Sequence, residues 1–281
     1  QSSGCSGGGV GSEPRPAPIA AGGGERPSAS ERFLRRLRHS PFLTDQIIHY
    51  HEQPARPAEY AMPRVELAPA VRALLEAAGR TRLYSHQACA VEALMGGGHV
   101  MLCTPTASGK SLGYLIPTLH AMATDGNSRA LFLFPTKALA QDQKRALRSL
   151  TNACATPLFG LPVATYDGDT PQAERAELRQ STRIFLSNPD MLHCSILPHH
   201  KEWAPFLSHL SYVVVDEAHM YGGVFGAHVA LILRRLRRLA RLYGSNPSFV
   251  CCSATVGNPA ELLQMLTGVS RDATTVITGD G

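Results

Sequence analysis

From about Arg82 onward, short apolar runs rich in β-branched and aromatic residues alternate with longer segments of helical spacing. Runs such as LFLF and YVVV carry apolar side chains on both faces, which is typical of parallel strands covered by helices on each side. The alternation therefore predicts an α/β fold with a mostly parallel, doubly wound sheet, whose ligands gather at the carboxyl ends of the strands. The predicted strands are His99–Cys103, Ala130–Phe134, Val163–Tyr166, Arg183–Ser187, Tyr212–Val215, Phe249–Cys252 and Thr274–Thr278.

Composition divides the chain into three parts. Of the first 30 residues, 18 are Gly, Ser or Pro, and such a segment buries too little apolar surface to offset the entropy of ordering it. We expect a disordered leader over residues 1–30, a short helical N-terminal extension over 31–81 and one α/β domain over 82–281. Within the extension, apolar residues at helical spacing predict a helix over Leu67–Ala78, followed by Gly79.

Composition also excludes several classes of protein. The chain has 281 residues, of which 44% are hydrophobic, so it is neither fibrous nor wholly disordered. It contains no run of about 18 apolar residues and opens with no secretory signal, which predicts no membrane association. The seven cysteines show no CxxC spacing, which favours free thiols in a reducing compartment. The net charge of +5 permits a polyanionic partner without indicating one.

The most specific chemical signal is the segment TPTASGKS, residues 104–111, which follows a predicted strand and precedes helical spacing. There it indicates a phosphate-binding loop, because backbone N–H groups at a helix N-terminus attract anions. Gly109 lets the backbone come close, Lys110 reaches the β- and γ-phosphates, and Ser111 binds Mg²⁺. Thr104 replaces the first glycine of the general pattern, and the alternative is an ordinary Ser/Gly turn. The predicted nucleotide-binding residues are Thr104, Pro105, Thr106, Ala107, Ser108, Gly109, Lys110 and Ser111.

A second apolar strand ends in Asp-Glu-Ala-His, residues 216–219. A phosphate-binding loop needs a carboxylate from another strand to hold Mg²⁺, and Asp216 has that position. Glu217 can orient and deprotonate the attacking water, so we predict Lys110, Asp216 and Glu217 as catalytic residues. Two acids after a strand are common by themselves, and the loop upstream favours the catalytic interpretation. Taken alone, His219 is typical of a core or surface histidine.

Seven motifs in order make the sequence resemble a superfamily 2 helicase of the DEAD/DEAH-box type. They are LYSHQ, TPTASGKS, PTKALA, YDGDT, SNPDM, DEAH and SAT, and the resemblance covers about residues 64–281. The segment DEAHMYGGVFGAHVALILRRLRRL looks most like the RecQ-four-like DNA helicases of fungi, plants, algae and some bacteria. The resemblance implies that 82–281 is a RecA-like P-loop domain, the helicase ATP-binding domain.

The family resemblance implies ATP and Mg²⁺ as cofactors, DNA as a partner in preference to RNA, and 3′-to-5′ unwinding in DNA repair and recombination. It also implies a second RecA-like domain, which this chain lacks, so we expect the chain alone to bind ATP and to hydrolyse it very slowly. An RNA helicase and a nucleotide-binding scaffold without catalysis are the alternatives. A nucleus is the expected location, or a bacterial cytoplasm, and the oligomeric state stays open.

The resemblance assigns further roles by position. Gln87 would contact adenine, while His219, Ser253 and Thr255 would couple the nucleotide to strand movement. Polar groups at the strand ends would grip phosphates without reading bases. The predicted nucleic-acid-binding residues are Thr136, Lys137, Gly168, Asn188 and Asp190. Helix N-capping is the alternative for Thr136, Asn188 and Asp190.

Two arginine runs and one histidine cluster leave alternatives open. For both runs a solvated helix face is favoured over contact with a polyanion or partner. The runs are Arg32, Arg35, Arg36 and Arg38, and Arg234, Arg235, Arg237, Arg238 and Arg241. The cluster of His193, Cys194, His199 and His200 matches no spacing of a structural zinc site, which predicts no zinc there.

Overall fold

The computed structural model describes residues 28–43, 46, 49, 57–254, 256–279 and 281. The chain divides into two compact units, 1–56 and 57–281. In the first unit, helix α1 (Ala29–Arg38) begins after Ser28, whose hydroxyl accepts a hydrogen bond from the Glu31 backbone N–H at 3.2 Å. The Glu31 carboxylate accepts one from the Ser28 N–H, which completes a capping box. The four arginines of this helix are exposed, and residues 1–27 of the predicted leader lie outside the described residues.

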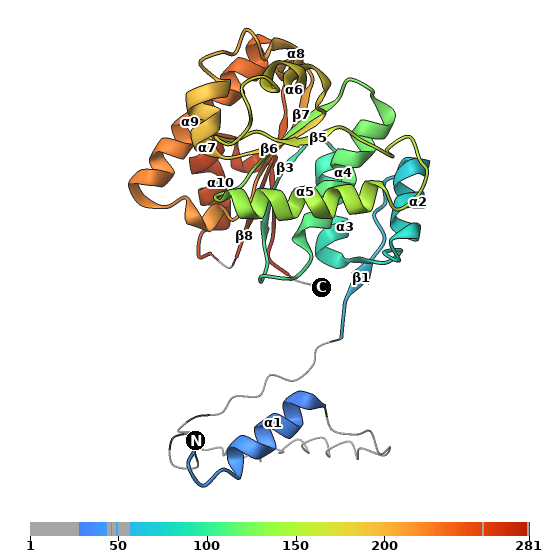
Figure 1. Ribbon diagram of the computed structural model, residues 1–281, viewed down its shortest axis with the longest axis vertical. Coiled ribbons are helices and arrows are strands. Elements are labelled where there is room, and N and C mark those ends of the chain that lie inside the picture. Colours follow the sequence, from blue (N-terminus) through green and yellow to red (C-terminus); the bar gives the residue numbers. More distant parts are fainter. Residues whose placement is uncertain (1–27, 44–45, 47–48, 50–56, 255, 280) are drawn as a thin grey trace, which may run out of the picture. The chain divides into compact units, whose positions relative to one another are not determined.

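A seven-stranded sheet lies at the centre of the second unit, in the order β5-β6-β4-β7-β8-β3-β9 (Figure 1). All neighbouring strands in it are parallel. The predicted parallel, doubly wound α/β fold is therefore confirmed, and every predicted strand is present with boundaries within two residues. The strands are β3 (His99–Cys103), β4 (Arg129–Leu133), β5 (Val163–Thr165), β6 (Ile184–Ser187), β7 (Leu210–Val215), β8 (Ser248–Ser253) and β9 (Thr274–Ile277).

Helices cover both faces of this sheet and enclose two apolar cores. Leu102 and Phe132 point to one core while Met101 and Leu131 point to the other, because successive side chains of a strand alternate between its faces. The first face carries α2 (Pro69–Ala77), α3 (Ser85–Met95), α4 (Lys110–Thr124) and α5 (Lys137–Thr151). The second carries η1 (Leu192–Ile196), α8 (Ala204–Leu207), α9 (Gly223–Leu242) and α10 (Pro259–Thr267). The shorter elements α6 (Arg175–Ser181), α7 (Pro189–Met191), η2 (Ala218–Met220) and η3 (Arg271–Ala273) connect these. Within the described part of the chain, no helix has the length and apolar character needed to cross a membrane.

The segment before the sheet contains a strand pair where only helices and turns were expected. Helix α2 confirms the predicted helix, but β1 (Tyr60–Ala61) pairs antiparallel with β2 (Leu83–Tyr84). The rings of Tyr60 and Tyr84 stack across this pair with their centroids 5.2 Å apart. Two residues are too few to show a strand period, so the pair depends on contacts that sequence spacing does not reveal.

The arginines of α9 fit the predicted solvated face in part, since Arg234, Arg238 and Arg241 are exposed. Three arginines of the run also bind backbone carbonyls of the domain, which the sequence did not indicate. Arg234 donates to the Met265 carbonyl at 3.1 Å, and Arg237 donates to that of Gly268. Both carbonyls lie at the C-terminal end of α10, where carbonyl groups lack partners within the helix. Arg235 donates to a carbonyl just after η1 at 3.3 Å. The charge of α9 therefore stabilises the ends of neighbouring helices.

Candidate functional site

The predicted site residues gather at the carboxyl edge of the sheet, because every strand runs in the same direction. The strand order divides this edge into two halves. Strands β7, β8 and β3 lie on one half and carry the loop cluster, which consists of Ser108–Ser111 with Asp216 and Glu217. Strands β4, β6 and β5 lie on the other and carry the cap cluster, which consists of Thr136, Lys137, Gly168, Asp169 and Asn188.

The loop between β3 and α4 has the backbone conformation of a tight cradle. Gly109 has a left-handed φ of +79°, and a Cβ placed there would lie 2.7 Å from Gln87 Nε2. Ala107 also has a positive φ, of +63°, which costs a residue with a side chain energy. The hydroxyls of Thr104 and Ser108 lie 2.7 Å apart and close the loop on itself.

Lys110 is the first residue of α4. Its ammonium donates to the carbonyls of Thr104 and Pro105, each at 2.8 Å. The cation is thereby held over the loop, beside the N–H groups that begin a 15-residue helix. That combination of a lysine and a helix N-terminus attracts a phosphate.

Gln87 is buried, and both ends of its amide bind backbone. Its Oε1 accepts from the Tyr84 N–H at 3.0 Å, and its Nε2 donates to the Gly109 carbonyl at 2.9 Å. The side chain therefore fixes the phosphate loop against the start of α3. The adenine contact implied by the family resemblance stays a prediction.

The acidic pair, Asp216 and Glu217, comes directly after β7, the strand that neighbours β8. The Asp216 N–H donates to the Leu133 carbonyl at 2.9 Å, and the Asp216 Oδ1 accepts from the Glu217 N–H at 2.9 Å. Burial, with a further contribution from the charge of Glu217, raises the pKa of Asp216 to about 6, although the N–H of Glu217 and the charges of Lys110 and His219 lower it. Glu217 has a positive φ of +49°. A largely buried carboxylate beside a second acid is a site that a cation would stabilise.

The oxygen donors of the loop cluster fit Mg²⁺. This cation prefers hydroxyl, carboxylate and phosphate oxygens and keeps several waters. Ser111 and Asp216 supply a hydroxyl and a carboxylate from α4 and the end of β7. In the described ranges, no group of three or more His, Cys, Asp or Glu side chains is arranged to hold a metal ion.

The Asp-Glu-Ala-His segment contacts the end of β8. The Nδ1 of His219 lies 3.3 Å from Glu217 Oε2, 3.4 Å from Ser253 Oγ and 3.4 Å from the backbone nitrogen of Ala254. The imidazole thus links the predicted catalytic base to the SAT segment. Thr255, the third predicted coupling residue, lies outside the described residues.

Two residues that sequence reasoning missed hold the loop cluster together. Cys103 Sγ donates to the Ala254 carbonyl at 3.2 Å and accepts from the Val256 N–H at 3.3 Å, which joins the phosphate-loop strand to the SAT segment. Gln143 Nε2 donates to Ser111 Oγ at 2.9 Å. The contacts of these two residues follow no recognisable spacing, because each partner lies far away in the sequence.

Local contacts define the cap cluster. The Thr136 hydroxyl accepts from the Leu139 N–H at 3.3 Å, and Asn188 Oδ1 accepts from the Met191 N–H at 2.8 Å. The capping alternative is therefore confirmed for Thr136 and Asn188. It is wrong for Asp190, which lies inside α7, two residues past the cap position that Asn188 occupies.

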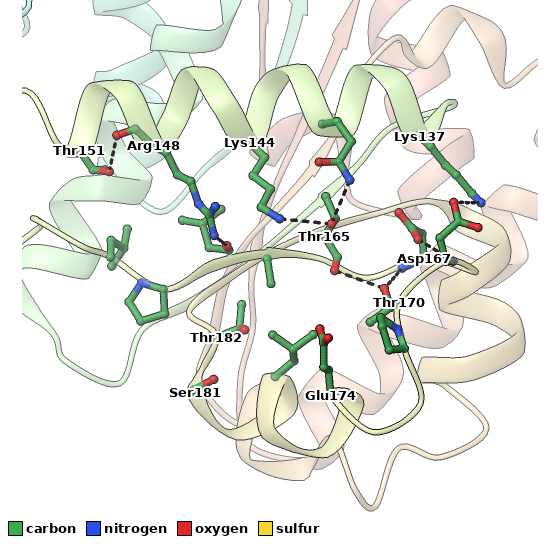
Figure 2. A pocket seen from close by; sticks show the side chains of 18 of the residues that line it. Lys137, Lys144, Arg148, Thr151, Thr165, Asp167, Thr170, Glu174, Ser181 and Thr182 are labelled. Carbon is green, nitrogen blue, oxygen red and sulfur yellow. Dashed lines mark hydrogen bonds and ion pairs between the residues drawn. The ribbon is translucent and has the colours of Figure 1, made fainter.

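An ion pair and a groove complete the cap cluster (Figure 2). Lys137 Nζ lies 2.7 Å from Asp169 Oδ2, on the turn that contains Gly168. From there a cavity of about 800 Å³ extends between α5 and the segment from β5 to α6. Lys144 and Arg148 line one wall, whereas the wall opposite carries carboxylates that include Glu174. Three cations, Lys137, Lys144 and Arg148, face three carboxylates, Asp167, Asp169 and Glu174, so the charge of the groove does not mark it as a polyanion site.

Comparison with known proteins places this arrangement in a family. The family model of the DEAD/DEAH box helicases matches residues 84–263. The chain belongs to the DEAD/DEAH box helicase family. This helicase domain is 44% identical over 224 residues to the uncharacterised ATP-dependent helicase YprA of Bacillus subtilis strain 168, covering 80% of the chain and 30% of that protein. It is 42% identical over 252 residues to the ATP-dependent helicase HRQ1 of Saccharomyces cerevisiae, covering 89% of the chain and 23% of that protein.

Crystal structures of the DUF1998 helicase MrfA have the same domain. The structure of MrfA bound to DNA superposes with a TM-score of 0.81 at 40% identity, over 91% of this chain and 35% of that one. The structure bound to DNA and AMPPNP gives 0.77 at 43% identity, over 83% and 32%. The RecA-like helicase fold implied by the resemblance is confirmed. The chain spans less than a third of the length of the curated relatives YprA and HRQ1.

Proposed function

We propose that the chain is the ATP-binding half of an ATP-dependent DNA helicase that moves 3′ to 5′. The observation that carries the proposal is the loop cluster, where a lysine at a helix N-terminus and two carboxylates from another strand lie at one edge of the sheet. This is the set of groups that phosphoryl transfer from a nucleoside triphosphate requires.

Each residue of the loop cluster has one role in this proposal. Lys110 and the N–H groups around Gly109 bind the phosphates, and Ser111 and Asp216 hold Mg²⁺. When bound, Mg²⁺ supplies positive charge that offsets charge developing on the phosphate oxygens. Glu217 accepts a proton from the attacking water as the general base. The imidazole of His219 links Glu217 to Ser253 and would couple the nucleotide bound at the site to movement along the strand.

The cap cluster is the proposed contact for nucleic acid. Exposed Lys137, with Gly168 and Asn188 at the neighbouring strand ends, suits a phosphate backbone and offers no arrangement for reading bases. Asp190, the fifth predicted residue, carries a negative charge that would repel a phosphate. The similarity to MrfA, which was crystallised bound to DNA, supports DNA as the partner. We extend the proposal to DNA repair and recombination in a nucleus, for which the support is the family resemblance.

One experiment tests this function. Steady-state ATPase of the full-length protein is measured alone, with single-stranded DNA and with RNA, and repeated for Lys110→Ala and Glu217→Gln. We expect stimulation by DNA and loss of turnover in both variants. Stimulation by RNA alone would identify an RNA helicase, and no turnover with either polymer would identify a scaffold without catalysis.

A further inference from the structure

Helix α5 reaches from one half of the carboxyl edge to the other. It begins in the cap cluster, where Thr136 caps it and Lys137 forms the exposed ion pair with Asp169. Gln143, six residues after Lys137, faces the neighbouring helix α4. Six residues span about 9 Å of helix. A single rigid element therefore carries both a cap-cluster cation and an amide that touches the loop cluster.

The amide of Gln143 is held by two hydroxyls of α4. Its Nε2 donates to Ser111 Oγ at 2.9 Å and to the Tyr114 hydroxyl at 2.6 Å. Tyr114 is 1% exposed, and its ring meets the Phe132 ring edge-on with centroids 5.3 Å apart. The tyrosine hydroxyl is thus a fixed point, and it sets where the Gln143 amide can lie.

This contact determines how the Ser111 hydroxyl is oriented. A serine oxygen has two lone pairs and one proton. Since one lone pair accepts from Gln143, only the other lone pair and the proton remain for a ligand. If Ser111 binds Mg²⁺, the free lone pair must point at the cation, and Gln143 restricts the rotations that achieve this.

We propose that Gln143 is a positioning residue that orients Ser111 and thereby couples the position of α5 to the nucleotide site. The inference rests on the proposed function, because it takes Ser111 as the Mg²⁺ ligand and the cap cluster as the DNA contact. DNA that binds at Lys137 shifts or stiffens α5, and the shift reaches Ser111 through a single side chain. Coupling between two binding sites is reciprocal, so Mg²⁺-nucleotide must in turn change the affinity for DNA.

The test uses equilibrium binding, which is independent of turnover. Binding of a fluorescent ATP analogue to the full-length protein is titrated at increasing Mg²⁺, with and without single-stranded DNA, for the wild type and for Gln143→Met. Methionine is uncharged and close to glutamine in size but donates no hydrogen bond. We expect the Mg²⁺ concentration for half-maximal binding to rise about 2- to 10-fold, the effect of one lost hydrogen bond. We also expect DNA to have little or no effect on the nucleotide affinity of Gln143→Met.

Gln141→Met is the matched control. Gln141 lies on the same helix, and its amide donates to Thr165 Oγ1 at 3.2 Å, away from Ser111. The control should keep the Mg²⁺ requirement and the DNA effect of the wild type. Equal behaviour of the two methionine variants in both measurements would overturn the role of Gln143.

The variant Lys110→Ala distinguishes failure of this inference from failure of the proposed function. If the wild type binds the analogue and Lys110→Ala does not, the nucleotide site is established, and the comparison of the two methionine variants decides on Gln143 alone. If Lys110→Ala binds as tightly as the wild type at every Mg²⁺ concentration, both the proposed site and the role of Gln143 are wrong. Thermal unfolding of each variant shows whether its fold is intact.

Discussion

The two halves of the carboxyl edge are built in different ways. In the loop cluster, several contacts join residues far apart in the sequence, such as Gln87 to Gly109 and Gln143 to Ser111. Its backbone is also strained: among the residues that the structure describes, Ala107 and Glu217 are the non-glycine residues with positive φ. Such strain persists only where the surroundings hold it in place.

The cap cluster shows the opposite construction. Thr136 and Asn188 each accept from an N–H three residues ahead, and the Lys137–Asp169 pair is exposed to solvent. The two caps form within one turn of chain and need no distant partner, whereas the ion pair joins residues 32 apart in sequence and lies in solvent. The difference teaches that the half proposed for chemistry is preorganised by contacts across the domain, whereas the half proposed for gripping a polymer depends on local caps and an exposed ion pair. Substitutions should therefore have larger effects in the loop cluster than in the cap cluster.

The largest difference between the two clusters is expected in the rate of hydrolysis, when Glu217→Gln is compared with a cap-cluster variant. The change removes the proposed base but keeps the size of the side chain, so hydrolysis should fall about 10²- to 10⁴-fold while nucleotide still binds. The comparison in the cap cluster is Lys137→Ala, which should change the rate at saturating DNA by less than about tenfold, because exposed charges contribute little each. Single-turnover hydrolysis of the full-length protein measures both. A similar loss in the two variants would show that the halves are not distinct.

Asp216→Asn should stabilise the fold in the absence of divalent cations. The pKa of Asp216 is raised from 3.8 to about 6, so the folded protein holds this proton more tightly than the unfolded chain does. A raised pKa contributes stability that is complete below pH 3.8 and is lost as the pH rises through 6. Above pH 6 the buried charge therefore costs at most about 3 kcal/mol, at 1.36 kcal/mol per pKa unit.

Urea unfolding in EDTA at pH 8 and pH 4 measures this effect. Asp216→Asn should be more stable than the wild type at pH 8, and the gain should nearly vanish at pH 4, where the wild-type carboxyl is neutral. The matched change Asp169→Asn affects an exposed carboxylate of the cap cluster, whose side chain is 79% exposed. It should alter the free energy of unfolding by less than about 1 kcal/mol. A gain for Asp216→Asn that is the same at both pH values would contradict the assigned cause.

Substituting a glycine in each cluster should give a smaller difference, measured as the free energy of unfolding. Gly109→Ala forces alanine into a left-handed conformation, at a cost of about 1–2 kcal/mol, and places its Cβ against Gln87. At Gly168 the φ is not positive, and an added Cβ would lie 3.8 Å from Lys137 Nζ. Gly168→Ala should thus change the free energy of unfolding by less than about 0.5 kcal/mol. Chemical denaturation separates the two, and equal costs would show that the phosphate loop is not preorganised as described.

The same distinction explains what could be predicted from the sequence. All seven strands of the sheet follow from apolar runs, and the phosphate loop follows from its place between a strand and a helix. Capping by Thr136 and Asn188 was predictable because a cap is a local contact. Cys103, Gln143 and the arginines of α9 were not, since their partners are distant in sequence and no period marks them. Contacts between residues close in sequence can be predicted from it, whereas the contacts that join the loop cluster to α3, α5 and the SAT segment are long-range.

The smallest expected effects are those of substitutions within the cap cluster. They distinguish a residue that caps a helix, Thr136, from a residue proposed to contact DNA, Lys137. Thr136→Ala removes a helix cap and should cost about 1 kcal/mol of stability, which Thr136→Ser should restore. Lys137→Ala breaks only an exposed ion pair, so its stability should hardly change. In DNA binding the order reverses: losing one phosphate contact at Lys137 should reduce the slope of log affinity against log salt by about 1. DNA titrations at several salt concentrations, beside unfolding curves, measure both quantities. If Lys137→Ala left the salt slope unchanged, the exposed half of the edge would hold its helices in place without contacting DNA through this lysine.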